Sequence, residues 1–242
     1  MTAAGTAKAD PTRIDQLLDR RTEANERFFA AEAGRVAALC REMAERFSDG
    51  HRLIAFGASQ QARSDARHVA VEFVHPVIVG KRALPAIGLA PEGGPLAAQV
   101  DMVAEPGDMA IAFGAEEAGA DVAAALEALR ERGCLTIAFA PVGAAWDFDP
   151  PTPDPFVRQE LAETLYHVLW ELVHVFFDHL GGSDAGGGAS SFLYPFLNRQ
   201  SGDLAAVVED VARSVEAKAH EVGELRAQTL GEGREPLAAA AA

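Results

Sequence analysis

Residues 53–72 decide the fold, and they read Leu-Ile-Ala-Phe-Gly-Ala-Ser-Gln-Gln-Ala-Arg-Ser-Asp-Ala-Arg-His-Val-Ala-Val-Glu. The run at 53–56 is too short and too uniformly apolar to be anything but a buried strand. A glycine ends it, a polar turn follows, and a helix is expected from about Ser64. His68 and Glu72 lie four residues apart on one face of that helix, the spacing that two metal ligands or an acid/base pair need. We therefore expect a functional site beside this turn.

Further short apolar runs, at 84–89, 110–113 and 135–139, alternate with helical segments such as 121–132. Such alternation with short links predicts βαβ units and a parallel sheet covered on both faces. Ligands of such sheets bind at the carboxyl ends of the strands. Residues 146–156 hold four prolines and are expected to form an extended loop.

Both ends of the chain are expected to be helical. Apolar residues recur at three- and four-residue steps through 12–47, which predicts two helices with a break near 31–34. A long helix is expected at 157–180, a flexible link at 181–200 and a C-terminal helix at 201–230. Residues 1–11 and 231–242 are expected to be disordered, so the main domain should span 12–180.

Composition narrows the class of function. The chain has 242 residues, a net charge of −15 and a pI near 4.8, which disfavours binding to nucleic acid or to an anionic membrane face. No apolar run is long enough to span a membrane and no leader is evident. The two cysteines, Cys40 and Cys134, suit a reducing compartment. We expect a cytoplasmic protein.

Several pieces of the sequence occur in the order and spacing of one known family. They are Phe56-Gly57 with the stretch 64–72, the stretch 81–87, Pro-Gly-Asp at 106–108, and Gln159-Glu160 with His167 eight residues after the glutamine. From about residue 13 to 175 the chain resembles the sugar isomerase (SIS) domain family, in its phosphoheptose isomerase branch. The resemblance implies a three-layer α/β/α SIS fold with a central parallel sheet, N-terminal helices and a C-terminal helical extension.

The resemblance also implies site residues and partners. In relatives that carry zinc, the ligands resemble His68, Glu72, Gln159 and His167, and the implied cofactor is therefore zinc. Glu72 and His167 match the pair that transfers the proton in aldose-ketose isomerisation, a reaction that needs a base and an acid beside an enediol. A metal could also polarise the carbonyl. Family members form dimers and tetramers with sites at subunit boundaries, so a homo-oligomer is expected.

Two departures from the family affect the ligand. The family follows its first strand with Gly-Asn-Gly-Gly-Ser, where this chain has residues 57–61, Gly-Ala-Ser-Gln-Gln. After the third strand, a Ser-Thr-Ser-Gly phosphate cradle is replaced by residues 114–117, Gly-Ala-Glu-Glu. A carboxylate there would repel each phosphate charge by about 4 kcal/mol at ~4 Å and an effective dielectric of 20. Our candidate ligand-binding residues are Ser59, Gln61, Arg63, Ser64, Asp65, Glu116 and Glu117.

The sequence leaves alternatives open. His68 and Glu72 could be an ordinary surface pair, and Glu116 and Glu117 a solvated turn. Arg63 and Arg67 could neutralise those glutamates or hold an anionic substrate.

For function, the leading hypothesis is a protein that binds a sugar or sugar-phosphate derivative. It would keep the acid/base or metal quartet but differ from a standard sedoheptulose 7-phosphate isomerase. One alternative is an active sugar-phosphate isomerase whose phosphate site is rebuilt from Ser59, Ser64 and an arginine. The other is a non-catalytic interaction or regulatory protein, as in SIS relatives that associate with the replication initiator.

Overall fold

The computed structural model describes residues 11–76, 81–114, 119–180 and 204–240. Within them, one sheet contains the strands β1 (Leu53–Gly57), β2 (Ala86–Leu89), β3 (Met109–Phe113), β4 (Leu135–Ala138) and β5 (Trp146–Asp147). Their order is β2-β1-β3-β4-β5, and all neighbours are parallel. The direction of winding reverses between β1 and β3, where such sheets bind ligands. The expected parallel sheet is confirmed.

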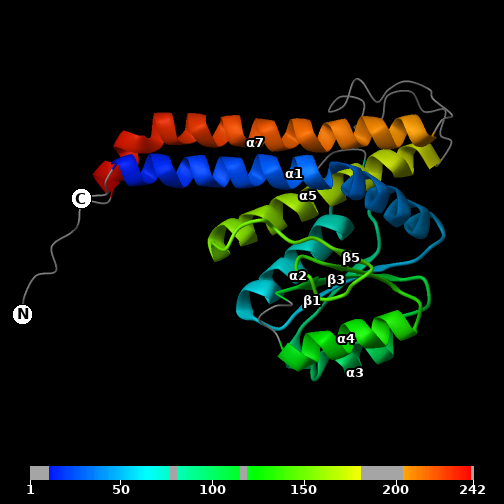
Figure 1. The fold of residues 1–242 in the computed structure, drawn as a ribbon. Helices are drawn as coiled ribbons and strands as arrows, with labels where there is room; N and C mark the ends of the chain where they lie inside the picture. Colours follow the sequence, from blue (N-terminus) through cyan, green and yellow to red (C-terminus); the bar gives the residue numbers. More distant parts are fainter. Residues whose placement is uncertain (1–10, 77–80, 115–118, 181–203, 241–242) are drawn as a thin grey trace, which may run out of the picture.

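Helices cover both faces of the sheet (Figure 1). On one face, α3 (Leu96–Val103) and α4 (Gly119–Glu131) pack against alternate strand residues such as Ile54 and Ala110. On the other face, α2 (Gln60–Val74) and α5 (Pro155–Leu180) pack against the intervening residues, such as Leu53 and Ile111. The strands read as uniformly apolar because every second side chain enters a different core.

A pair of long helices lies outside this layer. α1 (Pro11–Ser48) and α7 (Leu204–Ala240) run side by side in opposite directions, and α1 also packs on α5 (Figure 1). The break expected near 31–34 is wrong, because α1 continues through Gly34. Neighbouring Ala33, Val36 and Ala37 are buried, and their packing outweighs the roughly 1 kcal/mol that a helical glycine costs.

α7 extends ten residues beyond the expected end at 230. The prediction of disorder is therefore wrong for residues 231–240. Alanines at 238–240 are the strongest helix formers, and Arg234 pairs with Asp15 of α1. Even the 26-residue α5 and the 37-residue α7 lack a stretch apolar enough to span a membrane, as do the other described helices. The expected link at 181–200 and residues 1–10 lie outside the described residues.

Two other segments differ from expectation. Residues 146–156 are not loop throughout, because Trp146 and Asp147 form the edge strand β5 against Ile137 and Ala138. The Trp146 ring stacks with the ring of buried Phe148, with centroids 6.5 Å apart, and this contact stabilises the edge strand. Residues 90–105, for which no helix was predicted, contain the short helix η1 (Pro91–Gly93) and α3.

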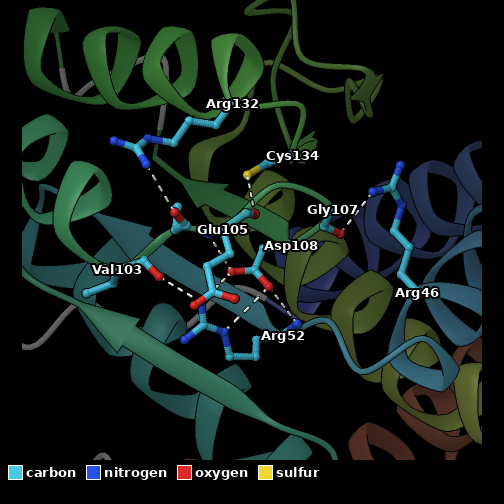
Figure 2. Close-up of polar contacts among 9 residues, drawn as sticks. Arg46, Arg52, Val103, Glu105, Gly107, Asp108, Arg132 and Cys134 are labelled. Carbon is cyan, nitrogen blue, oxygen red and sulfur yellow. Dashed lines mark hydrogen bonds and ion pairs between the residues drawn. The ribbon is translucent and has the colours of Figure 1, made fainter.

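The amino ends of β1 and β3 are joined by an ion pair between Arg52 and the buried Asp108, shown in Figure 2. The Asp108 carboxylate is 1% exposed and accepts hydrogen bonds from Arg52 Nη2 at 2.8 Å, Arg52 N at 2.9 Å and Glu105 N at 3.0 Å. Burial alone would raise the pKa of Asp108, but these donors lower it. The Pro-Gly-Asp stretch at 106–108 thus lies at the sheet edge opposite to the carboxyl ends of the strands.

Candidate metal and acid/base site

The turn after β1 is fixed by a capped helix. Ser59 is the N-cap of α2, and its Oγ accepts a hydrogen bond from Ala62 N at 3.1 Å. α2 therefore begins at Gln60, four residues before the expected start at Ser64. Gly57 is required there, because an added Cβ would lie 2.5 Å from Ala62 Cβ and 2.8 Å from the Ala62 carbonyl carbon.

α5 delivers the second set of side chains. Its first residue is Pro155, and the Asp154 carboxylate accepts from Phe156 N at 3.0 Å and from Val157 N at 3.4 Å. A proline at the first position and a preceding aspartate are typical helix-start signals. α5 then packs on α2, and the Trp170 indole N–H donates to the Glu72 carbonyl at 2.8 Å.

Three predicted site residues meet where the helices touch. Glu72 Oε1 lies 3.2 Å from His68 Nε2 and 3.2 Å from His167 Nε2. One ligand atom from each of the three residues lies within 4.8 Å of the others. The two histidine side chains are 49% and 43% exposed and the Glu72 side chain 18%, so the cluster opens to solvent.

Each imidazole has a partner for its other nitrogen. His167 Nδ1 lies 2.6 Å from the Glu163 carbonyl oxygen, which can only accept, so Nδ1 must carry a proton. His68 Nδ1 lies 3.2 Å from the Tyr166 hydroxyl. Such partners fix the ring orientation of metal-binding histidines.

Charges at the cluster reinforce one another. Burial alone would raise the pKa of Glu72, but hydrogen bonds and charge from His167 and His68 lower it below its ordinary value. Burial alone would lower the pKa of His167, but Glu72 and the Glu163 carbonyl raise it. A glutamate base and a protonated histidine therefore coexist over a wider pH range than isolated groups would allow.

The donor set fits a divalent metal. Two imidazoles and a carboxylate are typical zinc ligands, and ligand atoms around a tetrahedral zinc are about 3.3 Å apart. The two separations to Glu72 Oε1, 3.2 Å each, are close to that spacing, and all three ligand atoms lie within 4.8 Å of one another. Glu72 Oε2 is buried without a hydrogen-bond partner, an unsatisfied carboxylate oxygen that a cation would satisfy.

Hydrogen bonds from its amide nitrogen fix the Gln159 side chain. Gln159 Nε2 donates to both carboxylate oxygens of Asp65, at 2.9 and 3.0 Å, and to Glu163 Oε1 at 3.0 Å. This leaves the amide oxygen as the atom available to a metal or ligand. Buried Asp65 lies one turn before His68 on α2, and burial raises its pKa although Gln159 opposes the shift.

A hollow of about 310 Å³ adjoins Asp65 and Gln159 at the carboxyl ends of β1, β3 and β4. Ser59 and Gln61 also line it, together with Arg158. Arg158 Nη1 donates to Asp149 Oδ1 at 3.1 Å and to the Pro150 carbonyl at 2.9 Å. Arg158 was not among the predicted site residues, although it stands directly before Gln159.

The other candidate ligand-binding residues are placed differently. Arg63 pairs with Glu92 of η1, and neither Arg63 nor exposed Ser64 lines the hollow. Glu116 and Glu117 lie outside the described residues, so their position relative to the hollow stays a prediction.

Comparison with solved structures shows the fold: the chain has the SIS fold of the phosphoheptose isomerases. It is similar to phosphoheptose isomerase GmhA from Neisseria gonorrhoeae, with 17% identity and a TM-score of 0.54 over 67% of this chain and 95% of that one. It is also similar to a phosphoheptose isomerase from Francisella tularensis, with 15% identity and a TM-score of 0.57 over 67% and 97% of the two chains. No protein-family model and no curated protein sequence matches. The predicted fold is confirmed, and identities this low concern the fold alone.

Proposed function

We propose that this protein binds a sugar or sugar derivative in the hollow and interconverts its aldose and ketose forms. One observation carries the proposal: the Glu72 carboxylate is held 3.2 Å from imidazoles of two separate helices. The hollow itself is lined by Asp65, one turn before His68 on α2, and by Gln159, two turns before His167 on α5, and not by the three residues of the cluster. A surface pair of His68 and Glu72 alone would not explain the contact with His167, 95 residues away from Glu72 in sequence.

Each residue has a defined step. In the metal-free protein, Glu72 takes the proton from the carbon next to the carbonyl, and His167 gives its Nε2 proton to the carbonyl oxygen, which produces an enediol. Glu72 then returns the proton to the neighbouring carbon, while the hydroxyl on the carbon that first lost its proton gives that hydroxyl proton to His167 Nε2; this forms the new carbonyl and restores both residues. The lowered pKa of Glu72 and the raised pKa of His167 keep the base charged and the acid protonated.

A divalent metal such as zinc would be held by His68, Glu72 and His167, where it takes the place of the Nε2 proton of His167, with the amide oxygen of Gln159 as the further ligand that the family resemblance implies. When bound, it would polarise the substrate carbonyl. Asp65 would keep Gln159 oriented through the paired hydrogen bonds to its amide nitrogen.

The substrate anchor would differ from the family's serine-rich cradle. The hollow is lined by the N-cap Ser59, by Gln61 and by the cationic Arg158. The N-terminus of α2 and an arginine both favour an anionic group on the ligand. We therefore expect a polyhydroxy carbonyl compound whose anionic group is bound at this end of the hollow.

Hydrogen exchange tests the proposal before the substrate is known. The metal-free and the zinc-loaded protein are each incubated in deuterium oxide with a panel of aldoses, ketoses and their phosphates, and NMR follows deuterium incorporation next to the carbonyl. We expect incorporation into at least one compound and a loss of about 10²–10⁴-fold in the Glu72→Gln variant. Glu45→Gln, which alters an exposed carboxylate of α1 paired with Arg41, is the matched control.

Two outcomes would count against parts of the proposal. Incorporation into no compound, or undiminished incorporation with Glu72→Gln, would refute isomerisation. Turnover confined to sedoheptulose 7-phosphate at an ordinary rate, about 1 per second or more, would instead refute the altered anchor.

A further inference from the structure

We propose that Tyr166 is a positioning residue for the metal site, because its hydroxyl is placed to accept the Nδ1 proton that His68 must carry when its Nε2 binds a cation. This inference rests on the metal-binding part of the proposed function. Tyr166 contacts His68 through its hydroxyl, 3.2 Å from Nδ1, and approaches His167 through its ring. One side chain therefore touches both imidazoles.

The tautomer argument begins with the nitrogen that faces Glu72. A histidine ligates a metal through a nitrogen without a proton, and the proton then resides on the other nitrogen. Nε2 of His68 and Nε2 of His167 both face Glu72, so each Nδ1 must carry the proton when a metal is bound. The Glu163 carbonyl accepts from His167, and the Tyr166 hydroxyl is the recorded partner that can accept from His68.

Packing holds the Tyr166 ring in place. The side chain is 1% exposed, stacks on His167 at a centroid distance of 4.6 Å, and meets His68 edge to face at 5.7 Å. The Phe113 ring contacts it at 5.7 Å from the end of β3. Core packing therefore fixes the position of the Tyr166 hydroxyl, and the hydroxyl in turn orients the His68 ring.

The test is Tyr166→Phe, which keeps the ring and removes only the hydroxyl. Zinc affinity is measured by competition with a chromophoric chelator, and the cobalt-loaded protein gives a visible absorption spectrum that reports ligand geometry. We expect affinity to fall by about 10–100-fold, as for other outer partners of metal ligands, together with a changed cobalt spectrum. Thr164→Val is the matched control, because it removes a hydroxyl of α5 that donates to the Glu160 carbonyl.

A structural role alone would lower the melting temperature of both metal-free variants and leave the affinity and the cobalt spectrum of the folded protein unchanged. That result would overturn the inference. A second measurement needs no variant: long-range nitrogen–proton NMR of the zinc-loaded wild type should show His68 protonated on Nδ1, and protonation on Nε2 would also overturn it. If the wild type bound no zinc at all, the metal part of the proposed function would be refuted. Unchanged zinc affinity in the Tyr166→Phe variant would refute only the role of Tyr166.

Discussion

Glu72 has two carboxylate oxygens in different surroundings: Oε1 lies between two imidazoles, and Oε2 is buried without a partner. An unpartnered buried oxygen costs stability in a protein that has no use for it. The residues of this cluster differ in how well the sequence predicts their role. His68 and Glu72 are predictable from their spacing on one helix, whereas their contact with His167 depends on how α5 crosses α2. Tyr166 is hidden in an apolar stripe, and its hydroxyl, which needs a partner when buried, was the only signal.

The Glu72–His167 pair predicts how stability depends on pH. The pKa of His167 is raised from 6.5, so the pair's contribution is complete below that value and is lost as pH rises through the raised value. The pKa of Glu72 is lowered from 4.5, so the contribution is complete above that value and is lost as pH falls through the lowered value. Both groups are partly exposed, so the pair should contribute about 0.5–1 kcal/mol between these limits.

Urea denaturation of the metal-free protein checks this prediction. The difference in unfolding free energy between wild type and Glu72→Gln should be larger at about pH 5.5 than at about pH 9, where histidine is neutral. Glu224→Gln, at an exposed i,i+4 neighbour of His220, serves as the control. A difference that grows with pH would show that His167 is not paired with Glu72.

At the scale of single elements, the turn from β1 into α2 sets the position of the site. Gly57→Ala should destabilise the protein by about 1–3 kcal/mol, because the added methyl group would meet Ala62, including its backbone, at 2.5–2.9 Å. Gly34→Ala, within the exposed part of α1 where nothing lies within 4 Å, should instead stabilise it by about 0.5–1 kcal/mol. Thermal denaturation of both variants measures the contrast, and equal effects of the two substitutions would contradict the tight turn.

Some strands and helices were predictable from the sequence and others were not. Strands β1, β3 and β4 are buried on both faces, so their short apolar runs stand out from the helices around them. Strand β5 has only two residues, and its pairing with β4 depends on an edge that no local pattern reveals. The glycine at 34 predicted a break in α1 because sequence alone does not show that α5 and α7 pack along the helix.

At the scale of the whole molecule, Glu160 links three helices. Its carboxylate on α5 lies 2.6 Å from Arg21 Nη2 of α1 and pairs with Arg226 of α7. The Glu160 and Arg226 side chains are only 21% and 17% exposed, which makes this pairing stronger than a surface ion pair. It helps to fasten the α1–α7 pair to the sheet domain.

Glu160→Gln should therefore lower the unfolding free energy by about 2 kcal/mol, because it leaves two arginines without their shared carboxylate. Glu23→Gln should change it by less than about 0.5 kcal/mol, since the pair of Glu23 with Arg27 is 3.6 Å long and exposed. Urea denaturation compares the two. Similar small effects of both substitutions would mean that packing alone holds α1, α5 and α7 together.

The expected homo-oligomer stays a prediction, which light scattering on the purified protein can address.

The central claim is that α2 and α5 bring His68, Glu72 and His167 together as one cation site. Calorimetric titration of the metal-free protein with zinc tests it most directly. We predict one zinc ion per chain in the wild type and no binding at this site in the His68→Ala/His167→Ala double variant. Failure of the wild type to bind zinc, or unchanged binding by a folded double variant, would contradict the account.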